Sequence, residues 1–218
     1  MTYEGFRLKT LKFVRVKFAE HRKKQLLGTD FTIISNNCWG GMVYESYNLI
    51  KSSPTIGLFF MATDYIKFIS NLPHYLSSEL TFIKPEKSKN VDYLQTIKNF
   101  GVFPIAKLDD IEIVFLHYKT EEDARDKWTR RCQRINNEKL IIKFNDQNGC
   151  TEKELQDFIN LPYKNKIFFT SRRWNLFSQI IKKIWQPPFY DAITASHEPF
   201  GRKITKFINE LYKNDTEL

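Results

Sequence analysis

The feature that most constrains this chain is an apolar run, Phe31 to Ile34, which ends in a polar turn holding Cys38 and the pair Gly40-Gly41. A β-branched run of this kind is typical of a buried strand, and the amphipathic segment 42–50 after it predicts a helix. Ligands of open α/β sheets bind outside the carboxyl ends of the strands. The turn therefore predicts the position of a functional site better than it predicts a reaction.

The same pattern of strand, turn and helix recurs along the chain. Capping residues open the expected helices at Thr63, Thr120 and Thr151. This alternation predicts an α/β fold with three layers, in which helices cover both faces of a mostly parallel, Rossmann-like sheet. We expect one domain over residues 1–218, with a basic amphipathic helix at 1–28 and a helical C-terminal segment at 175–218. Besides the run at Phe31, the expected strands are 54–60, 111–118, 140–146 and 166–170.

Charge and apolar content limit the class of protein. The net charge of +9 favours an anionic partner, which is either nucleic acid, a lipid surface or a phosphate-bearing substrate. Aromatic residues fall mainly in the expected strands and on apolar helix stripes, so nucleic acid is the weakest of the three. No run reaches the roughly 18 apolar residues of a membrane span, and the N-terminus lacks the apolar core of a signal peptide. We therefore expect a cytoplasmic protein.

The basic N-terminal segment has two interpretations. It is either the first helix of the domain with a solvated basic face, or a helix that lies on the anionic inner face of a membrane. Three cysteines at wide spacing show neither a disulfide framework nor a zinc motif, so reduced thiols are expected. The sequence predicts no metal site and identifies no cofactor, although Asp109, Asp110 and Glu112 are an alternative acidic cluster for a divalent cation.

If the five strands are parallel, their polar ends meet at one edge and form an active site. Cys38 precedes a helix whose dipole would lower its pKa, which suits a nucleophile. His117 would act as its base, oriented by Asp146 or Asp64. The alternative is that Cys38 is a small buried residue packed against Trp39. Residues expected to bind substrate are Asn36, Asn37, Gly40, Asp64, Tyr118, Asn145, Arg172 and Arg173.

Several sequence blocks in order along residues 31–174 carry a resemblance to a known family. They are Ile34 to Gly41, Asp109 to Ile113, Phe115 to Lys119, Lys127-Trp128, Arg130-Arg131, Arg134 to Asn136, Phe144 to Asp146 and Cys150 to Glu152. Together they resemble an uncharacterised bacterial family of unknown function that is labelled exopolysaccharide biosynthesis protein. The resemblance implies a cytoplasmic bacterial protein associated with capsule or exopolysaccharide assembly, and it carries no mechanism.

Two hypotheses follow. The first is an enzyme of surface-polysaccharide biosynthesis that binds an anionic sugar donor or acceptor at the strand ends and transfers a glycosyl or acyl group. The second is a non-catalytic binding or assembly protein whose basic faces hold a polyanionic glycan or a membrane surface.

Overall fold

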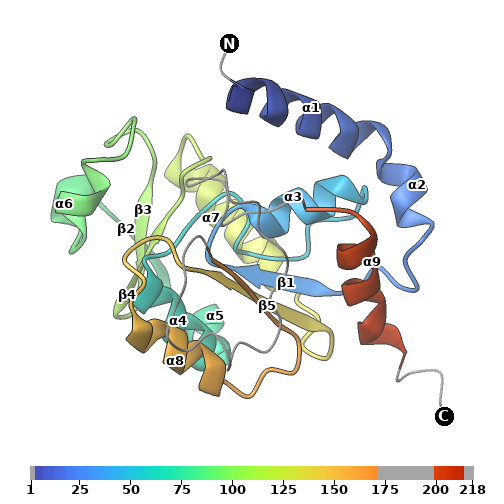
Figure 1. Ribbon diagram of the computed structural model, residues 1–218. Coiled ribbons are helices and arrows are strands. Elements are labelled where there is room, and N and C mark those ends of the chain that lie inside the picture. The colour runs from blue at the N-terminus through green and yellow to red at the C-terminus, as the bar shows by residue number, and fades with distance from the viewer. Residues whose placement is uncertain (1–2, 171–198, 214–218) are drawn as a thin grey trace.

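The computed structural model describes residues 3–170 and 199–213, and its elements are shown in Figure 1. Strands and helices alternate in mixed α/β fashion, as the sequence predicts. The strands are β1 (Thr32–Ser35), β2 (Leu80–Ile83), β3 (Ile105–Leu108), β4 (Ile111–Val114), β5 (Leu140–Asn145) and β6 (Lys166–Phe169). The helices are α1 (Tyr3–Lys17), α2 (Ala19–Lys23), α3 (Trp39–Ser46), α4 (Ala62–Ser70), α5 (Leu72–Ser77), α6 (Val91–Leu94), α7 (Glu121–Cys132), α8 (Glu152–Asn160) and α9 (Arg202–Asn209), with 3-10 turns η1 (Pro85–Lys87) and η4 (Glu210–Tyr212).

Three of the strands form a parallel sheet in the order β1-β5-β6. Ser35 pairs with Lys143, and Asn145 pairs with Phe169, so the carboxyl ends of all three strands lie along one edge. Alternate side chains enter two different apolar clusters, because successive residues of a strand point to opposite faces. Ile33 and Ile141 share a cluster with residues of α3 and α9, whereas Ile34 and Ile142 share one with residues of α4 and α8.

The other three strands form an antiparallel sheet in the order β2-β3-β4. The prediction that segment 111–118 is a central parallel strand is therefore wrong. Asp109, at φ 55°, and Asp110 form a tight turn between β3 and β4, and such a turn joins antiparallel neighbours. Figure 1 shows this sheet and α6 to the left of the parallel strands.

Segment 54–60 was predicted to be a strand, and this prediction is also wrong. Residues 54–57 form turns, and Gly57 has a φ of 80°. Only Phe59 makes an isolated bridge, with Val114 of β4. The segment is buried without being extended, because the chain crosses here from the parallel sheet to the antiparallel one.

The ends of the described chain are helical. The N-terminal basic segment forms α1 and α2, and Arg15 of α1 pairs with Glu45 of α3 at 2.8 Å. Helix α9 and turn η4 lie within the predicted C-terminal helical segment, of which residues 175–198 and 214–218 fall outside the described residues. Among the helices of the described ranges, none is both long and apolar enough to span a membrane.

Candidate functional site

A buried lysine organises the edge where the three parallel strands end. Lys143 lies in β5 and is 0% exposed, and its amino group donates to Asn37 Oδ1 at 2.8 Å and contacts Asn36 Oδ1 at 3.4 Å. Its Nζ also lies 5.4 Å from the centre of the Phe169 ring. We call the residues gathered here the strand-end cluster: Asn36, Asn37, Cys38, Lys143, Asn145, Asp146 and Thr170.

The turn after β1 is held by its own side chains. Asn37 Oδ1 accepts hydrogen bonds from the Trp39 amide at 3.1 Å and from the Ser35 hydroxyl at 3.3 Å, as well as from Lys143. The bond from Trp39 is an Asx turn, which asparagine favours. Asn36 donates to the carbonyl of Asn145 at 3.2 Å. The amide side chains therefore fix the turn and join the ends of β1 and β5.

The remaining cluster residues follow β5 and β6. Thr170 donates to Asp146 Oδ2 at 2.6 Å, and both side chains are buried. Asn145 is fully buried and donates to Gln147, whereas its Oδ1 accepts no hydrogen bond in the part of the chain that the structure describes. A buried amide oxygen without a donor is costly, which favours a ligand or water that donates to it.

Burial determines the protonation state of Lys143 and of Cys38. It lowers the pKa of Lys143 well below the usual value for lysine, although the charges of Cys38 and Asp146 oppose the shift. Burial also raises the pKa of the Cys38 thiol to about 11, against the opposing charge of Lys143. Both shifts favour the neutral form. The prediction that the helix dipole lowers the thiol pKa is therefore wrong, because desolvation outweighs it.

The structure does not bring the His117 ring to Cys38 through any hydrogen bond within the described ranges. His117 is exposed and follows β4 of the antiparallel sheet, and its backbone amide donates to Gly57 at 3.0 Å. The Cys38 sulfur lies 4.0 Å from the carbonyl of Leu58. The turn at 57–58 thus contacts both residues, and the role of His117 as a base stays a prediction.

Tyr118 and Asp64 form their hydrogen bonds with residues outside the strand-end cluster, although Tyr118 remains near it: burial raises its pKa, and the charge of Cys38 adds to the shift. The Tyr118 hydroxyl donates to the Ile56 carbonyl at 2.6 Å and accepts from Arg131. Asp64 is 2% exposed, accepts from Lys89 Nζ at 2.7 Å and from the Glu112 amide at 3.1 Å, and its pKa is raised by burial. The bond from the Glu112 amide to Asp64 joins α4 to β4, and substrate binding by Asp64 and Tyr118 stays a prediction.

Gly40 and the arginines complete the predicted set. A Cβ on Gly40 would lie 3.2 Å from the Ile33 side chain, so the glycine lets α3 pack closely on β1. Arg172 and Arg173 lie outside the described residues.

The acidic cluster near β4 is occupied by protein partners. Asp110 pairs with Lys67 at 2.5 Å, Asp109 pairs with His74 at 2.9 Å, and Glu112 accepts from Ser88 at 2.5 Å. Across the residues the structure describes, no group of three or more acidic, histidine or cysteine side chains is placed to hold a metal ion.

Sequence reasoning missed Lys143 and Thr170. A signal for Lys143 was present, because it is the one charged residue in the otherwise apolar run 140–144. A charge within a buried strand is costly and often marks function.

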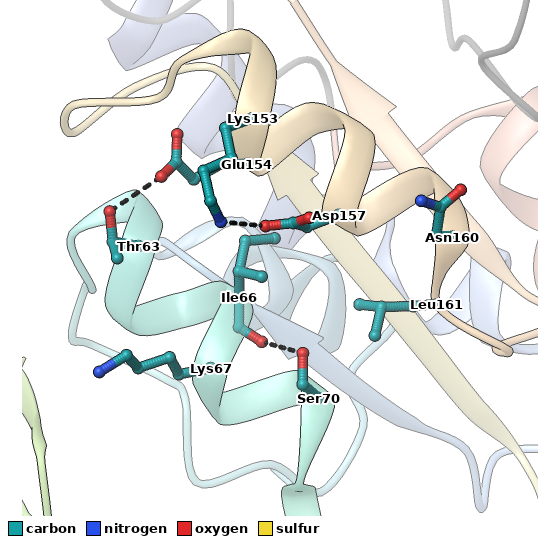
Figure 2. Close-up of a pocket in the computed structure, with 9 residues that line it drawn as sticks. All are labelled: Thr63, Ile66, Lys67, Ser70, Lys153, Glu154, Asp157, Asn160 and Leu161. Carbon is teal, nitrogen blue, oxygen red and sulfur yellow. Dashed lines mark hydrogen bonds and ion pairs between the residues drawn. The ribbon is translucent and has the colours of Figure 1, made fainter.

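A separate groove of about 390 Å³ lies between α4 and α8 and contains none of the predicted site residues. Figure 2 shows Lys153 paired with Asp157 and Thr63 bonded to Glu154 along its walls. These charged side chains are bonded to protein partners, so the groove has fewer polar groups free to bind a ligand than the strand ends have.

Comparison with known proteins places the chain in a family. A family model described as a domain of unknown function (DUF1919) matches residues 9–208, which is most of the chain. The chain belongs to the DUF1919 family. The DUF1919 chain described here is similar to an uncharacterized protein of Haemophilus influenzae. The two sequences are 34% identical over 155 residues, which cover 71% of this chain and 68% of that protein. The DUF1919 match includes the whole strand-end cluster.

Proposed function

We propose that this DUF1919 protein is an enzyme of capsule or exopolysaccharide biosynthesis that binds an anionic sugar donor or acceptor at the strand-end cluster. We propose that the protein acts in the bacterial cytoplasm. We also propose that its fold is a Rossmann-like arrangement of three layers, with the strand-end cluster at one edge of the sheet. The observation that supports the proposal is the amino group of Lys143, buried among amide oxygens where three parallel strands end. Ligands of parallel sheets bind at this edge.

An anion near Lys143 would change the protonation of its amine. Burial disfavours the charged form in the free protein, whereas a neighbouring anion favours it. Binding of a phosphate or carboxylate should therefore take up a proton. Asn36 and Asn37 hold the amine in place, so the charge forms at a fixed point.

The cluster supports glycosyl transfer better than acyl transfer through a thioester. A thiol with a pKa of about 11 is almost entirely protonated at neutral pH, so Cys38 would need a base before it could attack an acyl group. Glycosyl transfer needs a carboxylate that can accept the proton of the acceptor hydroxyl, and it needs no thiolate. Asp146, oriented by Thr170, supplies the carboxylate.

Calorimetric titration with nucleotide-linked sugars tests the proposal. We expect binding to a set of UDP- and CMP-linked sugars to be lost in Lys143→Met and kept in Lys166→Met. Lys166 is a matched control because it is also buried, lies in the adjacent strand β6 and donates to carbonyls at the end of α8. Titrations in two buffers of different ionisation enthalpy would measure the proton uptake. Equal binding by both variants and the wild type would contradict the proposal.

A second candidate function is docking on an anionic membrane surface, and the exposed face of α1 favours it. Phe13 is 62% exposed and Val16 is 56% exposed, and Lys9, Lys12 and Lys17 lie on the same helical face. Apolar residues flanked by lysines suit an interfacial helix. Figure 1 shows α1 lying along the outside of the molecule.

Sedimentation with vesicles tests this second function. Binding to phosphatidylcholine vesicles that contain phosphatidylglycerol should fall in Phe13→Ala and remain in Tyr93→Ala, an exposed aromatic of α6. Equal binding by the two variants would exclude this face as the contact.

A further inference from the structure

A second basic site lies between α2 and α9 and shares no residue with the strand-end cluster. It is a cavity of about 410 Å³. The charged side chains that line it are all cationic: Arg22, Arg202, Lys206 and Lys213. Figure 1 shows α2 and α9 side by side at the right of the molecule. A cavity with one sign of charge concentrates ions of the other sign.

Arg22 is the buried cation of this cavity, with 8% exposure. Its Nε donates to the Ser46 carbonyl at 2.7 Å, and its Nη2 donates to the carbonyls of Val14 and Arg15. Its Nη1 has no hydrogen-bond partner, and the side chain has no carboxylate partner, within residues 3–170 and 199–213. The guanidinium thus contacts neutral carbonyls and the Phe200 ring, whose centre lies 4.5 Å from Cζ, and a buried charge without a counter-ion is costly.

The cations of α9 add to this excess. Arg202 and Lys206 are exposed and form no ion pair with any residue in the described part of the chain. Lys213 is compensated by Glu210 at 2.7 Å. Three positive charges therefore surround the cavity without a matching carboxylate on its wall, and an anion bound there would reduce their mutual repulsion.

The walls of the cavity are fixed before any ligand binds. The Asn209 side chain accepts from the Leu27 amide at 2.9 Å and donates to the Gln25 carbonyl at 2.9 Å, which ties the segment after α2 to α9. Thr205 bonds to the hydroxyl of Tyr47 at 2.9 Å. A preformed site does not have to order its side chains when a ligand binds.

We propose that this cavity binds the phosphate group of a phosphomonoester. Its volume is at the small end of the usual range for ligand pockets, so a sugar phosphate fits better than a dinucleotide. Arg202 suits a phosphate because its guanidinium fork can donate two parallel hydrogen bonds to the phosphate oxygens. Arg22, whose Nε and Nη2 already donate to backbone carbonyls, adds its positive charge and the donors of Nη1. The same chemistry is presented by a soluble sugar phosphate and by the headgroup of phosphatidic acid.

Two titrations of the full chain distinguish these sources. The soluble arm uses glucose 6-phosphate and calorimetry. The lipid arm uses phosphatidylcholine vesicles with phosphatidic acid, compared with vesicles of equal charge that contain phosphatidylglycerol, a phosphodiester. Each arm compares Lys206→Ala with Lys203→Ala, which removes an exposed lysine of the same helix that does not line the cavity.

We expect Lys206→Ala to weaken binding of the phosphomonoester about ten-fold and Lys203→Ala to change it less than two-fold. Arg202→Ala should behave like Lys206→Ala. If Lys206→Ala weakens binding of glucose 6-phosphate in this way, the ligand of the cavity is a soluble phosphate. If the effect is seen only with phosphatidic acid vesicles, the ligand is the lipid headgroup. The proposal is overturned if neither ligand binds saturably, or if the two lysine variants lose affinity equally. Lys143→Met should leave this binding intact, which separates the cavity from the strand-end site.

Discussion

The amino group of Lys143 lies 2.8 Å from Oδ1 of Asn37, and this contact joins the middle strand of the parallel sheet to the turn after β1. The same oxygen accepts from the Trp39 amide at the start of α3. One amide oxygen therefore sets both the direction of the lysine and the beginning of the helix. The position of the buried amine therefore depends on this turn.

Replacement of Lys143 by Met should remove a pH dependence of stability. The folded-state pKa of Lys143 is depressed below 10.5, so between that lowered pKa and 10.5 the unfolded chain binds more protons than the folded one. The free energy of unfolding must therefore rise with pH through this window, by up to about 1.4 kcal/mol per pH unit. Urea unfolding at pH 7, 8 and 9 should show a steeper rise for the wild type than for Lys143→Met.

Lys107→Met is the control for this experiment, because it removes an exposed lysine from β3. The wild type and Lys107→Met should have the same slope against pH. A slope that is equal in the wild type and Lys143→Met would show that the buried amine keeps its proton on folding.

Cys38 should react slowly with iodoacetamide at pH 7.5. Its pKa of about 11 lies two units above the ordinary value of 9.0, so the thiolate fraction is roughly a hundred-fold lower than in a free cysteine. Mass spectrometry of the labelled peptides would follow Cys38 separately from Cys132 and Cys150. Labelling at the rate of glutathione under the same conditions would contradict the raised pKa, and labelling faster than glutathione would identify Cys38 as an activated thiol and support acyl transfer.

Tyr65→Phe should destabilise the junction of β1 and β5. The buried hydroxyl lies 2.9 Å from the Ile34 carbonyl and 2.8 Å from the Lys143 carbonyl. Loss of this buried hydrogen bond should cost about 0.5–1.5 kcal/mol, because the Lys143 carbonyl still accepts from the Asn36 amide at 3.4 Å. Tyr163→Phe, which removes a half-buried hydroxyl bonded to Ile69, should cost less in urea unfolding. Equal losses would show that the position of Tyr65 between the strands is unimportant.

The sequence predicted the parallel strands well because their patterns are local. The apolar run at 31–34 covers most of the observed β1, and the runs at 140–146 and 166–170 contain β5 and β6. The expected N-caps at Thr120 and Thr151 are present. The prediction that Thr63 is an N-cap is wrong, because α4 already begins at Ala62, after Met61. Segment 111–118 was wrongly predicted to be a parallel strand, because a continuous apolar run is also compatible with an antiparallel strand. The signal that would have corrected it is the pair Asp109-Asp110, which separates two short apolar runs as a hairpin turn does.

The sequence predicted those residues of the candidate site that follow the parallel strands. Asn36, Asn37, Cys38, Asn145 and Asp146 meet because β1 and β5 are neighbours. Tyr118 and Asp64 bond elsewhere because the strand before Tyr118 belongs to the antiparallel sheet. The raised pKa of Cys38 could not be predicted, because it depends on burial by tertiary packing, and local sequence patterns do not indicate that packing.

Asp64→Ala should destabilise the protein through β4 without changing ligand binding at the strand ends. The substitution leaves the buried Glu112 amide without its acceptor and removes the partner of Lys89. The first loss costs about 2 kcal/mol, whereas the second adds little because Lys89 is 44% exposed and screened by water. Asp109→Asn is the matched control, since Asp109 is 60% exposed and asparagine tolerates its φ of 55°, so the free energy of unfolding should change by less than about 0.5 kcal/mol. Urea unfolding measures both variants, and the nucleotide-sugar titration is repeated on each below the unfolding transition. Weaker sugar binding in Asp64→Ala at unchanged stability would return Asp64 to the substrate site, because a residue that only joins α4 to β4 cannot produce that result.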